Sequence, residues 1–354
     1  MSETRKIQKI GNTLYVSIPK TWTDQLKLKH GEKVTLVTQD GTISIYPQTG
    51  GTKSREITLT VTSKSSTQSL KRGIIAAYLD GFDTIELGTE TVFTEGQQDS
   101  VRETINSLFG LEVIEATSNT IVIECLLKQK MPVAKTIDRI HKVIMSIFNE
   151  TVSALELQNL GLVKGLGQRT QDCKRLSLVT NRLLRGVILF PQPSQIEEMS
   201  LIDCVDYLQI LHVTSEITAN LKKIAENIEL LIAQKLPKPL TKLLVETSEG
   251  IKKLYNDAVQ ALLSKDIPLA NTILDTSFNM DDLWSLCLKA NEKSEISGLS
   301  LAHLRVIIDS LEQIQEHTHE IANVSIDRAE AADARRSTPS LSSKKKNSIF
   351  GKNL

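Results

Sequence analysis

The chain has 354 residues, of which 4% are aromatic, and its 42 basic and 42 acidic side chains leave no net charge. This length predicts two or three domains, and the scarcity of aromatic residues favours packed helices with leucine, isoleucine and valine cores over an aromatic-rich β protein. Four widely separated cysteines argue against a zinc site or a disulfide framework and favour a reducing cytoplasm, and the lack of an apolar leader or of a run of about 18 apolar residues predicts no signal peptide and no membrane insertion.

The first fifty residues alternate short apolar and polar runs. RKIQKI predicts a basic strand, the Gly-Asn step a turn, and LYVSI a second strand whose Leu14, Val16 and Ile18 share one face. After Pro19, KTWTDQLKL predicts a short helix, and VTLVTQDGTISIYP predicts a hairpin with an Asp-Gly turn. So short a segment cannot cover this sheet alone, and we expect a second copy of the chain to pair with it.

This segment resembles the swapped-hairpin DNA-binding domain of the AbrB/SpoVT/MazE family over residues 5–47, and we assign the domain to residues 1–50. The resemblance lies in the basic strand, the Gly-Asn turn, IPK, the tryptophan helix, GEKV and the DG hairpin. It implies an interlocked homodimer that binds DNA through basic side chains of the first hairpin. The positions in this sequence are Arg5, Lys6, Lys9, Asn12 and Lys20. The alternative is that these are solvated strand charges and that the sheet only dimerises.

Positive charge is concentrated at both ends of the chain. Residues 1–50 have a net charge of +3 and residues 334–354 a net charge of +6, which leaves −9 for the remainder. An acidic body with basic ends indicates a polyanion bound at the ends. The tail at 334–354 is also poor in apolar residues and is expected to be disordered.

After a linker at 48–55, residues 55–130 are expected to form a small α+β module. EITLTV and DTIELG predict strands, each followed by a helical segment, and LEVIEATSNTIVIECLL predicts a hairpin. The order β-α-β-α-β-β suggests an open-faced sandwich that resembles ferredoxin-like regulatory modules. Such a module could bind a regulatory ligand or serve as a spacer that assists dimerisation.

From Pro132 onward, apolar residues recur at steps of three and four, which is typical of amphipathic helices. We therefore expect residues 131–330 to form an all-α bundle of two three-helix repeats, 132–235 and 240–330. The expected helices are 132–158, 168–190 and 198–235 in the first repeat, and 240–263, 266–291 and 299–330 in the second.

This tandem pattern resembles the PhoU domain over about residues 132–330, most closely in SLEQIQEHTHEIA. That family's metal feature is an acidic residue followed four positions later by aspartate, on the second and third helix of each repeat. The corresponding pairs here are Ser177 with Asn181, Lys222 with Glu226, Ser277 with Asp281, and Glu312 with Glu316. The resemblance thus implies a divalent or iron-type cation only at a degenerate set, Glu226, Asp281, Glu312 and Glu316. The alternative is that these carboxylates lie on solvated or ion-paired helix faces.

The two resemblances together imply an archaeal-type PhoU-family phosphate uptake regulator with an AbrB/SpoVT-like DNA-binding domain. We expect a homodimeric, cytoplasmic DNA-binding regulator whose bundle senses a signal or a partner. One alternative is an adaptor that docks on a phosphate transporter or a sensor kinase and uses its N-terminal sheet only to dimerise; another is a metal-storing or metal-sensing bundle. The sequence has no nucleophile elbow, catalytic triad or paired acid and base, so we expect no enzyme.

Overall fold

The structure is a computed structural model that describes residues 2–39, 42–47, 54–127, 132–189, 199–232, 234 and 236–337. The expected Asp-Gly turn at 40–41, linker residues 48–53 and tail residues 338–354 lie outside the described residues. The chain divides into two compact units, and the boundary between the N-terminal unit and the following module falls before Ser54. Each unit is described by itself.

The N-terminal unit consists of two hairpins with a short helix between them. Its elements are β1 (Gln8–Ile10), β2 (Thr13–Tyr15), α1 (Lys20–Gln25), β3 (Val34–Gln39) and β4 (Thr42–Pro47). Strand β1 pairs with β2, and β3 pairs with β4, both antiparallel. The first hairpin turns at Gly11, whose φ of 62° lies in the left-handed region that favours glycine. Strand β2 is shorter than the expected strand LYVSI. Its pairing with β1 ends at Tyr15.

Very little of this unit is buried within one chain. Among the described residues up to 47, Pro19 is the only one in the buried class. One face of the second hairpin presents apolar side chains to solvent, since Leu36 lies opposite Ile45 and both are exposed. Large apolar side chains are exposed throughout the unit: Ile7, Ile10, Leu14, Tyr15, Val16, Ile18, Leu26, Val34, Leu36, Ile43 and Ile45.

The middle module is a mixed four-stranded sheet with two helices. Its elements are β5 (Glu56–Val61), α2 (Thr67–Leu79), β6 (Thr84–Thr89), α3 (Glu95–Asn106), β7 (Leu111–Ala116) and β8 (Thr120–Cys125). The sheet has the order β5-β6-β8-β7, in which β5 and β6 are parallel and the other neighbours antiparallel. The predicted element order is therefore confirmed. The strand arrangement differs from the ferredoxin-like β-α-β-β-α-β pattern, because the crossover through α2 makes β5 and β6 parallel neighbours.

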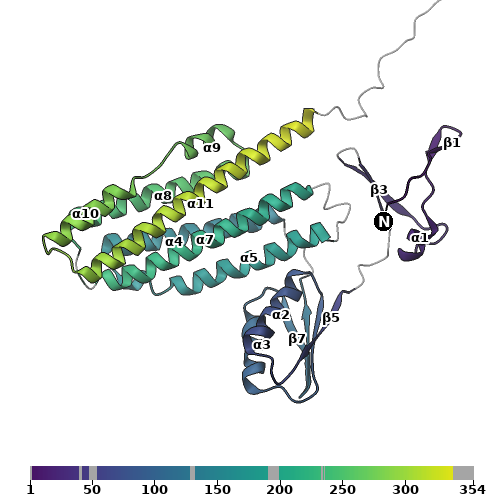
Figure 1. The fold of residues 1–354 in the computed structure, drawn as a ribbon, viewed down its shortest axis with the longest axis horizontal. Coiled ribbons are helices and arrows are strands. Elements are labelled where there is room, and N and C mark those ends of the chain that lie inside the picture. Colours follow the sequence, from purple (N-terminus) through teal and green to yellow (C-terminus); the bar gives the residue numbers. More distant parts are fainter. Residues whose placement is uncertain are drawn as a thin grey trace, which may run out of the picture. The chain divides into compact units, whose positions relative to one another are not determined.

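Local capping fixes the start of each helix in this module. Ser66 caps α2 by accepting a hydrogen bond from the Ser69 backbone N–H at 3.1 Å, and Thr94 with Gln97 forms a capping box at α3. Both helices lie together on one side of the sheet (Figure 1). The buried core between these layers includes Ile74, Tyr78, Ile85, Leu87 and Ile123.

The C-terminal part is all helical. Its long helices are α4 (Val133–Leu157), α5 (Leu166–Leu189), α7 (Leu201–Ile232), α8 (Lys238–Ser264) and α11 (Gly298–Ser337), with the shorter α9 (Ile267–Leu274) and α10 (Met280–Glu292) between α8 and α11. The long helices run side by side along one direction (Figure 1), and one buried core reaches from Val133 to Val324 across both repeats. The fold class expected from the sequence is thus confirmed. Within the described residues, no helix combines the length and apolar character that crossing a membrane requires.

The prediction of one continuous helix at 266–291 is wrong, because α9 and α10 are separate helices. Tertiary contacts stabilise the break. The backbone N–H of Phe278 donates to Oε1 of Gln315 on α11 at 2.7 Å, and the Phe278 ring lies so close to Gly250 that a side chain there would overlap it. Asn279 then caps the start of α10. Helix α11 continues to Ser337, which is four residues into the segment expected to be disordered.

Arginines of α5 join the bundle to the middle module. The guanidinium of Arg182 is almost fully buried, donates to the backbone carbonyl of Tyr78 and lies 3.4 Å from Oδ1 of Asp83. The more exposed Arg185 pairs with Asp80. These contacts join α5 to the end of α2 and to the start of β6.

Candidate nucleic-acid interface

The pairing register of β1 with β2 determines which side chains of the first hairpin project to the same face. Lys9 on β1 lies opposite Leu14 on β2, and Ile10 lies opposite Thr13. Side chains directly opposite each other in an antiparallel pair project to the same face. Lys9 therefore shares its face with Leu14, and both side chains are exposed. A basic group and an apolar group lie next to each other on this surface.

Arg5 and Lys6 lie in the segment that leads into β1, and both are exposed. Nη2 of Arg5 is 3.0 Å from Oε1 of Glu3, with 39% of the arginine side chain and 45% of the glutamate side chain exposed. An ion pair this exposed contributes little to stability. A phosphate group can therefore replace Glu3 as the partner of Arg5 at small cost.

Asn12 and Lys20 occupy different places in the unit. Asn12 lies in the turn between β1 and β2, and Lys20 is the first residue of α1 after the cap residue Pro19. Both are exposed. The structure thus gathers Arg5, Lys6, Lys9 and Asn12 on the first hairpin and its leading segment, whereas Lys20 belongs to the helix that follows.

The basic side chains of the first hairpin and its leading segment are all exposed, and the amide of Asn12 lies at the turn. Lysine and arginine bind phosphates through charge, and an asparagine can donate to a phosphate or contact a base edge. Contacts of the first kind position a nucleic acid and give salt-sensitive affinity, but they carry no sequence information.

The carboxylates proposed as metal ligands are all exposed on the helices. Oε1 of Glu226 on α7 is 3.5 Å from Nζ of Lys222. Asp281 lies in the first turn of α10, where the positive end of the helix dipole favours a carboxylate. Its expected companion Ser277 lies in the break before α10, so the two do not share a helix face.

Glu312 and Glu316 lie one turn apart on α11, as expected from their spacing. Among the described residues, no three histidine, cysteine, aspartate or glutamate side chains gather in a way that could hold a metal ion.

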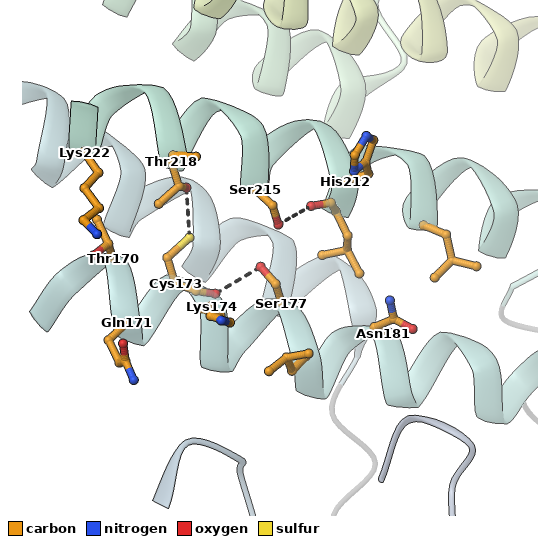
Figure 2. Close-up of a pocket in the computed structure, with 14 residues that line it drawn as sticks. Thr170, Gln171, Cys173, Lys174, Ser177, Asn181, His212, Ser215, Thr218 and Lys222 are labelled. Carbon is orange, nitrogen blue, oxygen red and sulfur yellow. Dashed lines mark hydrogen bonds between the residues drawn. The ribbon is translucent and has the colours of Figure 1, made fainter. Parts of the chain in front are cut away.

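Three residues of the degenerate pairs, Ser177, Asn181 and Lys222, line a groove between α5 and α7 that the sequence did not predict, drawn in Figure 2. Its floor includes Cys173, whose Sγ is 3.3 Å from Oγ1 of Thr218. Burial raises the pKa of this thiol, so Cys173 stays protonated and unreactive. The signal in the sequence is the recurrence of lysine, serine and asparagine at steps of three and four along α5.

Two comparisons relate the chain to known proteins. Residues 7–53 match the sequence model of the family described as "Antidote-toxin recognition MazE, bacterial antitoxin". No curated protein matches the chain. The crystal structure of PhoU from Pseudomonas aeruginosa is similar with a TM-score of 0.50 and 15% sequence identity, over 56% of this chain and 96% of that one. At this identity the likeness shows the fold alone. The chain therefore joins a MazE/AbrB-like N-terminal domain to a helical part with the fold of PhoU.

Proposed function

We propose that the protein is a homodimeric, cytoplasmic DNA-binding regulator of phosphate uptake, whose helical part senses a signal or a partner. The observation that carries this proposal is the surface of the N-terminal unit, where exposed cations adjoin exposed apolar side chains. The family match and the PhoU fold supply the context.

The exposed apolar side chains support pairing with a second copy of the chain. A monomeric soluble protein rarely exposes a contiguous apolar face of this kind. On the second hairpin, Val34, Leu36, Ile43 and Ile45 lie on one face, since β3 and β4 pair in the register Leu36–Ile45. Burying this face against its counterpart would remove it from water and would give the two basic hairpins a fixed spacing.

The cations support DNA as the ligand of that dimer. Arg5, Lys6, Lys9 and Lys20 give four basic side chains in each chain, and a dimer doubles the set. A dimer that neutralises four to eight phosphates should bind with a slope of log affinity against log salt of about −4 to −7. Asn12 at the hairpin tip is the side chain best suited to reach a base edge.

The proposal is tested by recovering genomic DNA fragments on the full-length protein and titrating the recovered sequence in gel shifts at several salt concentrations. We expect Lys9→Glu and Lys20→Glu each to weaken binding by about tenfold or more and to flatten the salt slope. Lys33→Glu is the matched control, because it makes the same charge change at an exposed position of the same unit.

Equal losses of DNA affinity in all three variants would show that only the net charge matters. The assignment of DNA binding to Lys9 and Lys20 would then be wrong. If the dimeric protein causes no gel shift of DNA even at low salt, the result favours the alternative function of an adaptor over DNA binding. Phosphate regulation is tested separately, by deleting the gene and measuring phosphate uptake and transporter transcripts under phosphate limitation.

A further inference from the structure

The groove between α5 and α7 has the size and the polar lining of a small-molecule site. Its volume is about 590 Å3, within the range of about 300–1,000 Å3 that is typical of ligand pockets. Six of its lining residues are polar side chains that a ligand can contact: Lys174, Ser177 and Asn181 on α5, and His212, Ser215 and Lys222 on α7. In each helix these follow one another at steps of three, four or seven, so each set lies on one face.

The charge in the groove is positive. Lys174 and Lys222 line it, and no aspartate or glutamate does. Lys222 has Glu226 at 3.5 Å, but both side chains are more than half exposed, so this pair is weak and easily exchanged. The groove thus has two ammonium groups available to an anion. A metal cation is disfavoured at the same place.

Hydroxyl groups lie between the two ends of the groove. The Oγ of Ser177 donates to the Cys173 carbonyl at 3.0 Å, and the Oγ of Ser215 donates to the Leu211 carbonyl at 2.8 Å (Figure 2). Each hydroxyl keeps its lone pairs, and each can rotate to donate to a ligand instead. The walls can therefore accept or donate hydrogen bonds as the ligand requires.

Asn181 supplies an unsatisfied polar atom. Its Oδ1 is buried and has no hydrogen-bond partner among the described residues. Figure 2 places Asn181 near His212 at one end of the groove and Lys222 at the other end. A buried acceptor without a partner is unusual in a folded protein. Figure 2 shows this oxygen pointing along α5, and rotation of the amide would turn it toward the groove, where a hydroxyl or amino group of a ligand would satisfy it.

We propose that this groove binds a small phosphorylated molecule, with its phosphate at Lys174 and Lys222 and a hydroxyl- or amino-bearing end at Asn181. A phosphate monoester carries about −1.5 to −2 charges at neutral pH, which two lysines match, whereas a single carboxylate matches only one. The ligand class is thus a nucleotide or a sugar phosphate. Its role as a signal rests on the proposed regulatory function, but its binding does not.

Isothermal titration of the full-length protein in the absence of DNA tests the site with four probes: adenosine 5′-monophosphate, glucose 6-phosphate, unphosphorylated adenosine and inorganic phosphate. We expect saturable binding of a phosphorylated probe and at least about tenfold weaker binding of adenosine, since the charged contacts are lost. The tighter of the two phosphorylated probes identifies the nucleotide or the sugar source. Because no DNA is present, failure here leaves the DNA-binding proposal untouched.

Substitutions distinguish binding in the groove from nonspecific attraction to exposed lysines. The double substitution Lys174→Gln with Lys222→Gln should weaken the phosphorylated probe by about thirtyfold or more. Lys242→Gln is the matched control, because Lys242 is also exposed and also pairs with a glutamate four residues later, at 3.6 Å, but lies outside the groove. It should leave binding unchanged. Circular dichroism melts check that each variant is folded.

The Asn181→Ala variant tests the opposite end. It should weaken the phosphorylated organic probe by about tenfold and leave the weaker binding of inorganic phosphate unchanged. The proposal is overturned if no phosphorylated probe binds at millimolar concentration, or if Lys242→Gln reduces binding as much as the double variant. It is equally overturned if Asn181→Ala changes neither ligand, because the ligand then has no second contact.

Discussion

The N-terminal unit and the helical bundle differ in how much apolar surface each removes from water within a single chain. In the bundle, Ile140, Ile144 and Ile147 are fully buried, whereas Ile7 and Ile43 in the N-terminal unit are 66% and 72% exposed. Both regions are rich in aliphatic side chains, so composition does not cause the difference. Long helices pack on one another and complete a core, while two short hairpins leave apolar faces without a cover.

The two regions therefore differ in whether they need a partner to bury their apolar side chains. The core of the bundle is complete within the chain, and polar side chains of α5 and α7 line a groove on it. The N-terminal unit has almost no core, so its stability should depend on association. Each aliphatic side chain that becomes fully buried contributes about 1.5–3 kcal/mol, which makes pairing of the hairpins strongly favourable.

The largest effect is expected from charging the apolar face of the second hairpin. Leu36→Glu combined with Ile45→Glu places two carboxylates opposite each other on that face, where pairing would have to bury them. We expect a monomer in light scattering and a loss of DNA affinity of about a hundredfold or more, because two linked basic surfaces bind far more tightly than one.

The control for that variant charges exposed apolar residues of the bundle, through Leu288→Glu combined with Val306→Glu. Both side chains are 39% exposed, and the protein should stay dimeric. If the hairpin variant remains a dimer as well, the contrast between the two regions fails.

A smaller but clear loss of stability is expected from creating a cavity in the core of the bundle. Ile217 on α7 is fully buried, and Ile217→Ala should lower the free energy of unfolding by about 2–5 kcal/mol. Denaturant titration followed by circular dichroism measures this loss. Dimer formation should not change, whereas dissociation of this variant at temperatures where the bundle is folded would contradict the independence of the two regions.

An intermediate loss of stability is expected from removing the contact of Arg182 between the middle module and the bundle. Arg182→Ala leaves the Tyr78 carbonyl without this donor in a buried position, which should cost about 1–3 kcal/mol. Hydrogen exchange should then show faster opening of α2 while α7 keeps its protection. Arg185→Ala is the matched control, because Arg185 and Asp80 are both more than 40% exposed, and it should cost less than about 1 kcal/mol.

The smallest effect concerns pH. His141 on α4 lies in the bundle core with its ring centroid 5.4 Å from that of Tyr255, and burial lowers its pKa from the usual 6.5. The unfolded chain therefore binds a proton below pH 6.5 that the folded chain excludes. The stability due to neutral His141 is present above that pH and is lost as the pH falls toward the folded-state pKa.

This loss is at most about 1.4 kcal/mol per pH unit for one proton. Thermal melts at pH 7.5 and 5.5 should show a smaller difference for His141→Leu than for the unmodified chain. An equal or larger difference would mean that other groups account for the acid sensitivity.

The sequence predicted most of the helices closely, because apolar residues at steps of three and four define both the helix and its buried face. The expected helix at 132–158 is found at Val133–Leu157, and that at 168–190 is found at Leu166–Leu189. The order of the middle module followed from its strand and helix segments, and the structure shows that Ser66 and Thr94 cap the two helices.

The break between α9 and α10 was not predictable in the same way. The backbone N–H of Phe278 in this break donates to the side chain of Gln315, which lies 37 residues further along the chain. The groove was not predictable for a similar reason. The sequence pointed to Ser177, Asn181 and Lys222 as members of degenerate pairs on separate helices, and only the packing of α5 against α7 brings them together beside Lys174.

The element types, their order and the basic character of the first hairpin could be predicted from the sequence, since these depend on neighbours a few residues apart. The folded chain was needed to see which polar groups gather between α5 and α7, where a helix is interrupted, and which apolar faces remain uncovered. Those outcomes depend on side chains that are distant in the chain, and local periodicity contains no information about which of them meet.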